Sequence, residues 1–219
     1  MKRIFFLVLT TLVFFCCTAE EKKTYQSANC YVRYDEAQGR VSAEATFNHP
    51  ESKIAVEVPG GVRFQSNDMK ATTTYGHMYR YEETVKFQPE QVFEWGPKNK
   101  GASTLKVGIV PIQNFSFGTS EISFGDAVKL TWDGAALGKG ETLVFMWENK
   151  EKGLTVPLEV STTIGEPIVE IPGEKMKSIS PGNWTLYLVR KKLQKSNVDG
   201  IAVNSILEYY TKPIALKIK

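Results

Sequence analysis

The sequence is poor in the residues that build most catalytic and metal sites. Its 219 residues include only two histidines, His49 and His77, and three cysteines, Cys16, Cys17 and Cys30. It contains no HExxH, Cys-x-x-Cys or Gly-x-Ser-x-Gly motif and no Asp-x-Asp-x-Asp calcium loop. Zinc sites need three or four convergent ligands. We therefore expect no metal, no cofactor and no catalytic residues.

The chain also lacks an excess of charge of one sign. Its 27 basic and 24 acidic residues give a formal net charge of +3. Nucleic-acid-binding proteins normally carry a clear excess of Lys and Arg, so we expect no nucleic-acid partner. Because 42% of the residues are hydrophobic and 11% are aromatic, a disordered acidic tail is excluded and a globular protein is indicated.

No apolar run is long enough to span a bilayer. The longest extends from Ile4 to Phe15, twelve residues after Lys2 and Arg3, whereas a spanning helix needs about 20. A basic start followed by a short apolar run is typical of a secretory signal peptide. We predict a signal peptide over residues 1–16, or to residue 19 if the chain is not lipidated, and export of the mature protein.

The leader ends in two cysteines, and the segment from Val13 to Cys17 resembles a bacterial lipobox. In that family, signal peptidase II cuts before a cysteine that then carries lipid, and a small residue precedes this cysteine. Phe15 precedes Cys16, whereas the smaller Cys16 precedes Cys17, so Cys17 is the better lipid anchor. The alternative is ordinary cleavage after Ala19, which would give a soluble secreted protein.

The resemblance implies a bacterial cell-envelope lipoprotein that is tethered to a membrane through Cys17. Residues 17–27 would form a charged tether that includes Glu20, Glu21, Lys22 and Lys23. An acidic pair soon after the anchor is similar to the surface-export signals of some Gram-negative lipoproteins. We therefore expect an outer-membrane lipoprotein that faces the periplasm or the cell surface, with secretion in soluble form as the alternative.

From residue 30 onward, the apolar residues recur with a period of two. Alternation from Val41 to Phe47 indicates a half-buried strand, and the uniformly apolar Leu143–Trp147 indicates a central strand covered on both sides. Only Glu174 to Ile179 could form a helix, of a single turn. Cys30 lies in a strand-like run, so we expect a buried core thiol rather than a reactive one.

Many short strands separated by turn residues indicate a β-sandwich. About fourteen such segments exceed one seven-stranded sandwich. We therefore predict an all-β protein with two consecutive antiparallel β-sandwich domains, residues 28–117 and 121–219. The polar stretch 118–120 is the boundary.

The second predicted domain resembles immunoglobulin-like and fibronectin type III-like modules. The residues that carry the resemblance are Trp132 on an early strand and the run Ile-Ser-Pro-Gly-Asn-Trp at 179–184. That run is similar to the turn before the penultimate strand of such modules. Trp184 stands where a tyrosine is usual, so the hydroxyl-to-backbone bond of a tyrosine corner is not expected. The resemblance is architectural and implies no activity.

Tyr75, His77, Tyr79 and Tyr81 alternate along one predicted strand and so share one face. If this stripe faces solvent, it is a stacking platform for sugar rings or for a protein surface. If it faces inward, it is core. Charged residues on the opposite face of the strand favour the inward arrangement.

The last thirty residues hold seven basic side chains against Asp199 and Glu208. Arg190, Lys191, Lys192 and Lys195 could form a basic patch for anionic lipid head groups or acidic polysaccharide, beside a polar loop at 194–200. The alternative is a solvated hairpin whose lysines keep an edge strand from pairing with neighbours.

These features predict a non-catalytic cell-envelope lipoprotein that acts as a binding or structural module. Its partner would be a protein, a glycan or an envelope surface. The competing interpretation is a secreted glycan-binding accessory module or a hydrolase. Partner identity and oligomeric state are not encoded in any recognisable motif.

Overall fold

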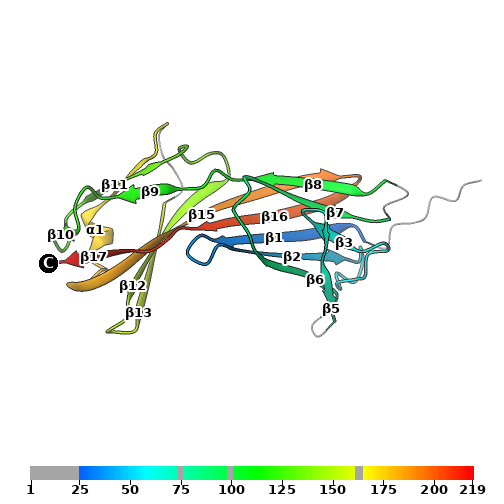
Figure 1. The fold of residues 1–219 in the computed structure, drawn as a ribbon, viewed down its shortest axis with the longest axis horizontal. Coiled ribbons are helices and arrows are strands. Elements are labelled where there is room, and N and C mark those ends of the chain that lie inside the picture. Colours follow the sequence, from blue (N-terminus) through cyan, green and yellow to red (C-terminus); the bar gives the residue numbers. More distant parts are fainter. Residues whose placement is uncertain (1–24, 74–75, 98–100, 161–164) are drawn as a thin grey trace, which may run out of the picture.

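A ten-stranded sheet runs the length of the protein, and two smaller sheets cover its two ends (Figure 1). The computed structural model describes residues 25–73, 76–97, 101–160 and 165–219. The large sheet has the order β10 (Glu121–Ile122), β17 (Ile214–Ile218), β15 (Gly182–Val198), β16 (Ile201–Tyr210), β1 (Ser27–Asp35), β2 (Arg40–Asn48), β6 (Met78–Thr84) and β5 (Lys70–Thr72), while β12 (Glu141–Asn149) joins β15 and β13 (Leu154–Val160).

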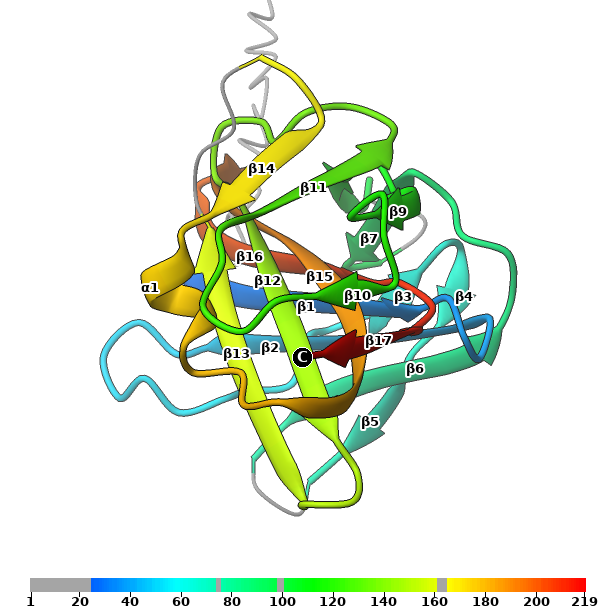
Figure 2. The same cartoon turned by 90° about the vertical axis from the view of Figure 1, so that its left-hand side faces the viewer.

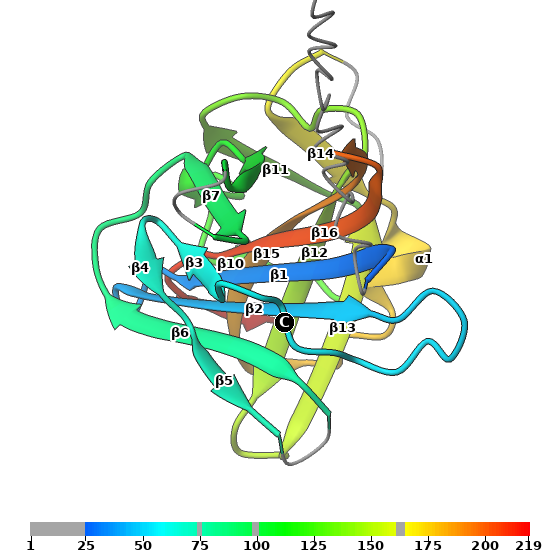
Figure 3. The same cartoon turned by 90° about the vertical axis from the view of Figure 1, so that its right-hand side faces the viewer.

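Each small sheet packs on a different half of the large one. The small sheet of the first half has the order β4 (Asn67–Asp68), β3 (Val62–Phe64), β7 (Glu90–Trp95) and β8 (Ser103–Gly108), and Figure 3 shows this half from its end. The second, which lies above β12 and β13 in Figure 2, has the order β14 (Ile168–Ile171), β11 (Val128–Asp133) and β9 (Gln113–Ser116). The predicted all-β sandwich class is confirmed. The one helix of the described residues, α1 (Gly173–Met176), is the single turn that was expected.

The alternation of apolar and polar residues explains the half-buried strands. The side chains of β2 alternate between buried and half-buried positions, as Val41 to Phe47 predicted. β12 differs from the prediction. It is central, between β13 and β15, but only one of its faces is buried, and Val144 and Met146 lie half-buried on the other. Apolar residues on both faces therefore did not mark a strand covered on both sides.

Strand β15 is the element that connects the two halves. Its 17 residues span about 55 Å at the rise of an extended strand. Its first five residues pair with β17, and Val189 to Val198 pair with β16. The polar loop expected at 194–200 is mostly strand, because β15 continues to Val198 and turns only at Asp199 and Gly200. Its polar side chains concealed the strand in the sequence.

Two hydrophobic cores lie along the large sheet. The first is centred on the fully buried Phe47, whose ring lies 5.4 Å from that of Trp95 and 5.1 Å from that of Tyr25. The second contains Trp147, which stacks on Phe117 at 5.9 Å.

Two separate segments of the chain contribute side chains to the first core. Buried side chains of β16 belong to the first core, although the sequence grouped them with residues 121–219. β16 pairs with β1, and this pairing, like that of β10 with β17, is parallel. The domain bounds 28–117 and 121–219 otherwise stay a prediction.

The turn before β15 contains a tryptophan version of the tyrosine corner. Trp184 is 2% exposed, and its indole N–H donates to the carbonyl oxygen of Ser180 at 2.7 Å. No such bond was expected from the sequence, because a tyrosine hydroxyl is missing. An indole N–H supplies an equivalent donor, and it reaches the backbone four residues upstream.

We expect Trp184→Phe to lower the free energy of unfolding by about 1 to 3 kcal/mol, because the Ser180 carbonyl loses its donor and the smaller ring leaves space. Chemical denaturation of the purified protein measures this change. Asn183→Ala, at the exposed neighbouring position, is the control and should change stability by less than about 0.5 kcal/mol. Equal stabilities of the two variants would contradict the role of the corner.

Candidate functional site

The predicted aromatic stripe is largely part of the first core. Tyr79 is 3% exposed, and its hydroxyl accepts the backbone N–H of Val58 at 2.8 Å. His77 is half-buried, and Tyr81 is half-buried against the first core. Tyr75 lies outside the described residues. The inward arrangement therefore holds for Tyr79, and the described part of the stripe is no solvent-facing platform.

The four residues of the predicted basic patch lie on opposite faces of β15. Lys191 and Lys195 face outward, whereas Arg190 and Lys192 face the interior. Lys191 is 3.8 Å from a carboxylate oxygen of Glu208, and Lys195 is exposed. The structure does not bring the four side chains together into one surface.

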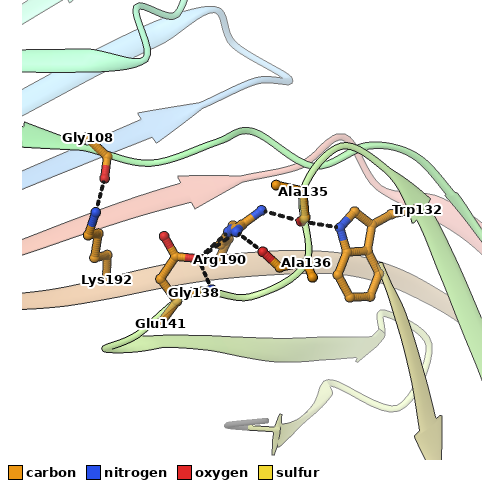
Figure 4. A network of polar contacts seen from close by, with 8 residues as sticks. All are labelled: Gly108, Trp132, Ala135, Ala136, Gly138, Glu141, Arg190 and Lys192. Atoms are coloured by element: carbon orange, nitrogen blue, oxygen red, sulfur yellow. Dashed lines mark hydrogen bonds and ion pairs between the residues drawn. The ribbon is translucent and has the colours of Figure 1, made fainter. Parts of the chain in front are cut away.

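Arg190 is instead the centre of a buried polar network (Figure 4). The side chain is 1% exposed, and its Nε and Nη2 atoms lie 3.0 and 2.5 Å from Oε2 of Glu141. Nη1 donates to the carbonyl of Ala135 at 3.0 Å, and Nη2 donates to that of Ala136 at 2.7 Å. The backbone N–H of Gly138 donates to the same Glu141 oxygen at 2.8 Å. Both charges are thus paired and hydrogen-bonded, as buried charges must be.

This network lies where the two cores meet. Arg190 is opposite Leu143 of the second core on one neighbouring strand and opposite Tyr209 of the first core on the other. Two residues along β15, the Lys192 ammonium donates to the carbonyl of Gly108 in β8 at 2.7 Å (Figure 4). The predicted basic patch thus contains side chains that fix the junction between the two halves.

The loop between β11 and β12 is shaped around this junction. The carbonyls of Ala135 and Ala136 in this loop hold the Arg190 guanidinium. Gly140 has φ +76°, and a Cβ atom there would lie 2.7 Å from the Leu193 carbonyl oxygen. Any other residue at position 140 would therefore push the loop away from β15.

A cluster of tyrosines that the sequence did not reveal lies on the outward face of the large sheet. Its members come from β1, β15 and β16, and we call it the outward tyrosine cluster: Tyr31, Arg33, Tyr187, Lys191, Glu208 and Tyr210. The hydroxyls of Tyr31 and Tyr210 donate to Oε2 of Glu208 at 2.7 and 2.9 Å. The Arg33 guanidinium lies 3.9 Å from the centre of the Tyr210 ring, and Tyr187 stacks on that ring at 6.2 Å.

The tyrosines of this cluster stay protonated at physiological pH. Burial, together with the Glu208 carboxylate, raises the pKa of Tyr210 to about 12 and also raises the pKa of Tyr31. Burial and the Glu148 carboxylate raise the pKa of Tyr187. The protonated hydroxyls of Tyr31 and Tyr210 donate to Glu208, so the cluster presents aromatic rings with charged groups between them.

Sequence reasoning missed this cluster because its residues are far apart in the chain. Tyr31 and Glu208 are 177 positions apart, and only the parallel pairing of β1 with β16 brings them together. The local signal was the pair Tyr209–Tyr210, in which one ring must face outward if the other faces the core.

The sequence also made predictions for two cysteines, Cys17 as a lipid anchor and Cys30 as a core residue. Cys17, the predicted lipid anchor, lies outside the described residues. Cys30 is buried in β1, as expected, and burial raises the pKa of its thiol to about 12. The thiol is therefore protonated at neutral pH and is a poor nucleophile. No helix in the described part of the chain is long and apolar enough to cross a bilayer.

No protein-family model matches the chain, and the comparison with curated proteins gave no match. Among solved structures, the chain is similar to the fibronectin(III)-like modules of Clostridium thermocellum CbhA, with 12% identity, 91% of this chain and 93% of that chain covered, and a TM-score of 0.22. It is also similar to the FN1-FN3 domains of chicken CNTN1, with 8% identity, coverage of 90% and 68%, and a TM-score of 0.21.

We expect Arg190→Met to lower the free energy of unfolding by about 3 to 5 kcal/mol, because it leaves the Glu141 carboxylate buried without its partner. Chemical denaturation measures this. Lys195→Met removes an exposed charge from the same strand and should change stability by less than about 0.5 kcal/mol. A small and equal effect of both variants would show that Arg190 does not hold the junction.

Proposed function

We propose that the protein is a non-catalytic cell-envelope module, tethered to a membrane by lipid on Cys17, which binds a protein partner through the outward tyrosine cluster. The observation that carries the proposal is the cluster itself: tyrosine rings and an arginine, joined by hydrogen bonds and ring contacts, on the outward face of a sheet. Tyr and Arg are enriched among the residues that dominate the energy of protein–protein interfaces.

The position of the start of β1 would suit such a tether. β1 begins opposite Ala202, a residue that comes just after the β15–β16 turn. This is the end of the first half that is farthest from the second core. The C-terminus lies at the opposite end of the long axis (Figure 1). A lipid on Cys17 would be at most about 28 Å of extended chain from Tyr25. The first half would then lie next to the membrane, and the second half would extend away from it.

The junction supports a module that presents its surfaces at a fixed angle. The two halves share β15, and the Arg190–Glu141 pair ties β15 to β12 at the junction. Tyr187 comes from the part of β15 in the second half, whereas Tyr31 and Tyr210 come from strands of the first half. A partner that binds the cluster therefore contacts strands of both halves.

We expect Cys17→Ser to move the protein from the membrane fraction to the soluble fraction and to remove the mass of the lipid. Fractionation of the producing cells and mass spectrometry of the protein measure both effects. Cys16→Ser is the matched control and should leave the protein in the membrane. Unchanged membrane association of Cys17→Ser would refute the tether, and cleavage after residue 19 would show the secreted alternative.

We expect a photo-crosslinking amino acid in place of Tyr187 to form one discrete protein adduct in intact cells. The same amino acid in place of the exposed Lys129, on the three-stranded sheet of the opposite layer, should not form it. Arg33→Glu should abolish the adduct, because it reverses the charge beside Tyr210. Adducts of equal strength at both positions, or an adduct insensitive to Arg33→Glu, would argue against the proposed surface.

A further inference from the structure

A cavity of about 120 Å³ opens at the edge of the first half, between β6 and the β3–β4 hairpin. It lies on the interior side of the large sheet, whereas the outward tyrosine cluster lies on the other side. Tyr81, a member of the predicted stripe, lines it. The cavity is smaller than the roughly 300 Å³ at which sites for drug-sized ligands begin, so only a small group can enter it.

The floor and walls of the cavity are aromatic. Phe64 and Tyr34 are buried at its base. The Tyr81 ring lies 5.3 Å from that of Phe64, and the Phe87 ring lies 5.0 Å from that of Tyr34. Phe64 and Tyr34 are buried, so the half-buried rings of Tyr81 and Phe87 are the aromatic faces that a ligand ring can reach.

The rim of the cavity is polar and is held in place by hydrogen bonds. The Gln65 amide donates to the carbonyl of Glu90 at 2.9 Å and to the side-chain oxygen of Gln88 at 3.2 Å. The Asn67 amide donates to the Tyr81 hydroxyl at 3.3 Å and to the Gln65 carbonyl at 3.1 Å. Asn67 and Gln88 are exposed, so their amide groups border the opening.

The turn that carries Gln65 is strained. Gln65 and Ser66 have φ angles of 49° and 65°, a left-handed conformation that costs a residue other than glycine about 1 to 2 kcal/mol. The hydrogen bonds of the Gln65 amide hold the turn in this conformation. The strained turn places Asn67 beside the Tyr81 hydroxyl at the rim of the cavity.

The charges at the rim are balanced. The Tyr81 hydroxyl donates to Glu83, and Lys86 also lines the cavity. Burial and the Glu83 carboxylate raise the pKa of Tyr81 to about 12, so its hydroxyl remains a donor. One acidic and one basic side chain give no net attraction for an ion of either sign. The amide N–H groups of Gln65 and Asn67 donate within the protein, which leaves their side-chain oxygens as acceptors for the hydroxyl groups of a ligand.

We propose that this cavity binds one ring of a neutral sugar, whose apolar face stacks on Tyr81 and whose hydroxyls donate hydrogen bonds to the side-chain oxygens of Gln65 and Asn67. The rest of a longer glycan would extend out of the cavity across the exposed rim. This site goes beyond the proposed protein-binding surface and does not depend on it.

The test is an NMR titration of the amide-labelled protein with methyl glycosides of glucose, galactose, mannose and N-acetylglucosamine, and with glucuronate as a charged comparator. Each is added to about 10 mM, at which a site with a Kd of about 1 mM is mostly filled. We expect at least one neutral sugar to shift the signals of Gln65, Asn67 and Tyr81. No shift with any neutral sugar, shifts confined to other residues, or stronger binding of glucuronate would overturn the proposal.

Two variants separate binding from folding. Asn67→Ala removes an exposed rim amide and should weaken binding about fivefold, the effect of one hydrogen bond, without loss of the folded spectrum. Thr84→Ala changes the outward face of the same strand that carries Tyr81 and should bind as the wild type does. Equal affinity of both variants would overturn the site. Because the Tyr187 crosslink and the Cys17→Ser fractionation do not involve the cavity, a failure of sugar binding would leave the proposed function intact.

Discussion

The buried pair of Arg190 and Glu141 fixes how the two halves of the protein are joined. A buried ion pair gains little over well-packed apolar residues, because removing two charges from water offsets most of their attraction. Its contribution here is to fix the relative position of the elements that it joins. One guanidinium contacts a carboxylate on β12 and two carbonyls of the preceding loop. A small rotation of the second half would break several of these bonds at once.

Strand β15 continues through both halves and so joins them at this junction. Two sandwiches joined by a linker could rotate freely, but here one strand provides inward side chains to both cores. The β16 strand then returns along the first half and pairs with β1. The first core is therefore completed by β16, which lies between strands of the second core in the sequence, so the first half combines strands that are far apart in the chain.

Period-two patterns predicted the strands well but not which residues meet. The alternation from Val41 to Phe47 was enough to identify β2, because one face of that strand is buried and the other is not. The run from Gln194 to Val198 gave no such signal, since its inward residues are mostly polar and bond to one another, as Gln194 does to Ser196. Arg190 looked like a surface cation because local sequence carries no trace of Glu141, which is 49 positions away.

The same limit explains why the aromatic stripe was informative only in part. Strand periodicity correctly placed Tyr79 and Tyr81 on one face, but it did not show that this face meets the β3–β4 hairpin. Beside this hairpin, Tyr81 lines a cavity and is not fully enclosed in the core. On the other face of the sheet, the parallel pairing of β1 with β16 gathers tyrosines from three strands. Surfaces that could bind ligands thus arise from long-range strand pairing, which cannot be predicted from a single sequence. The strands themselves arise from local patterns, which can be recognised in the sequence.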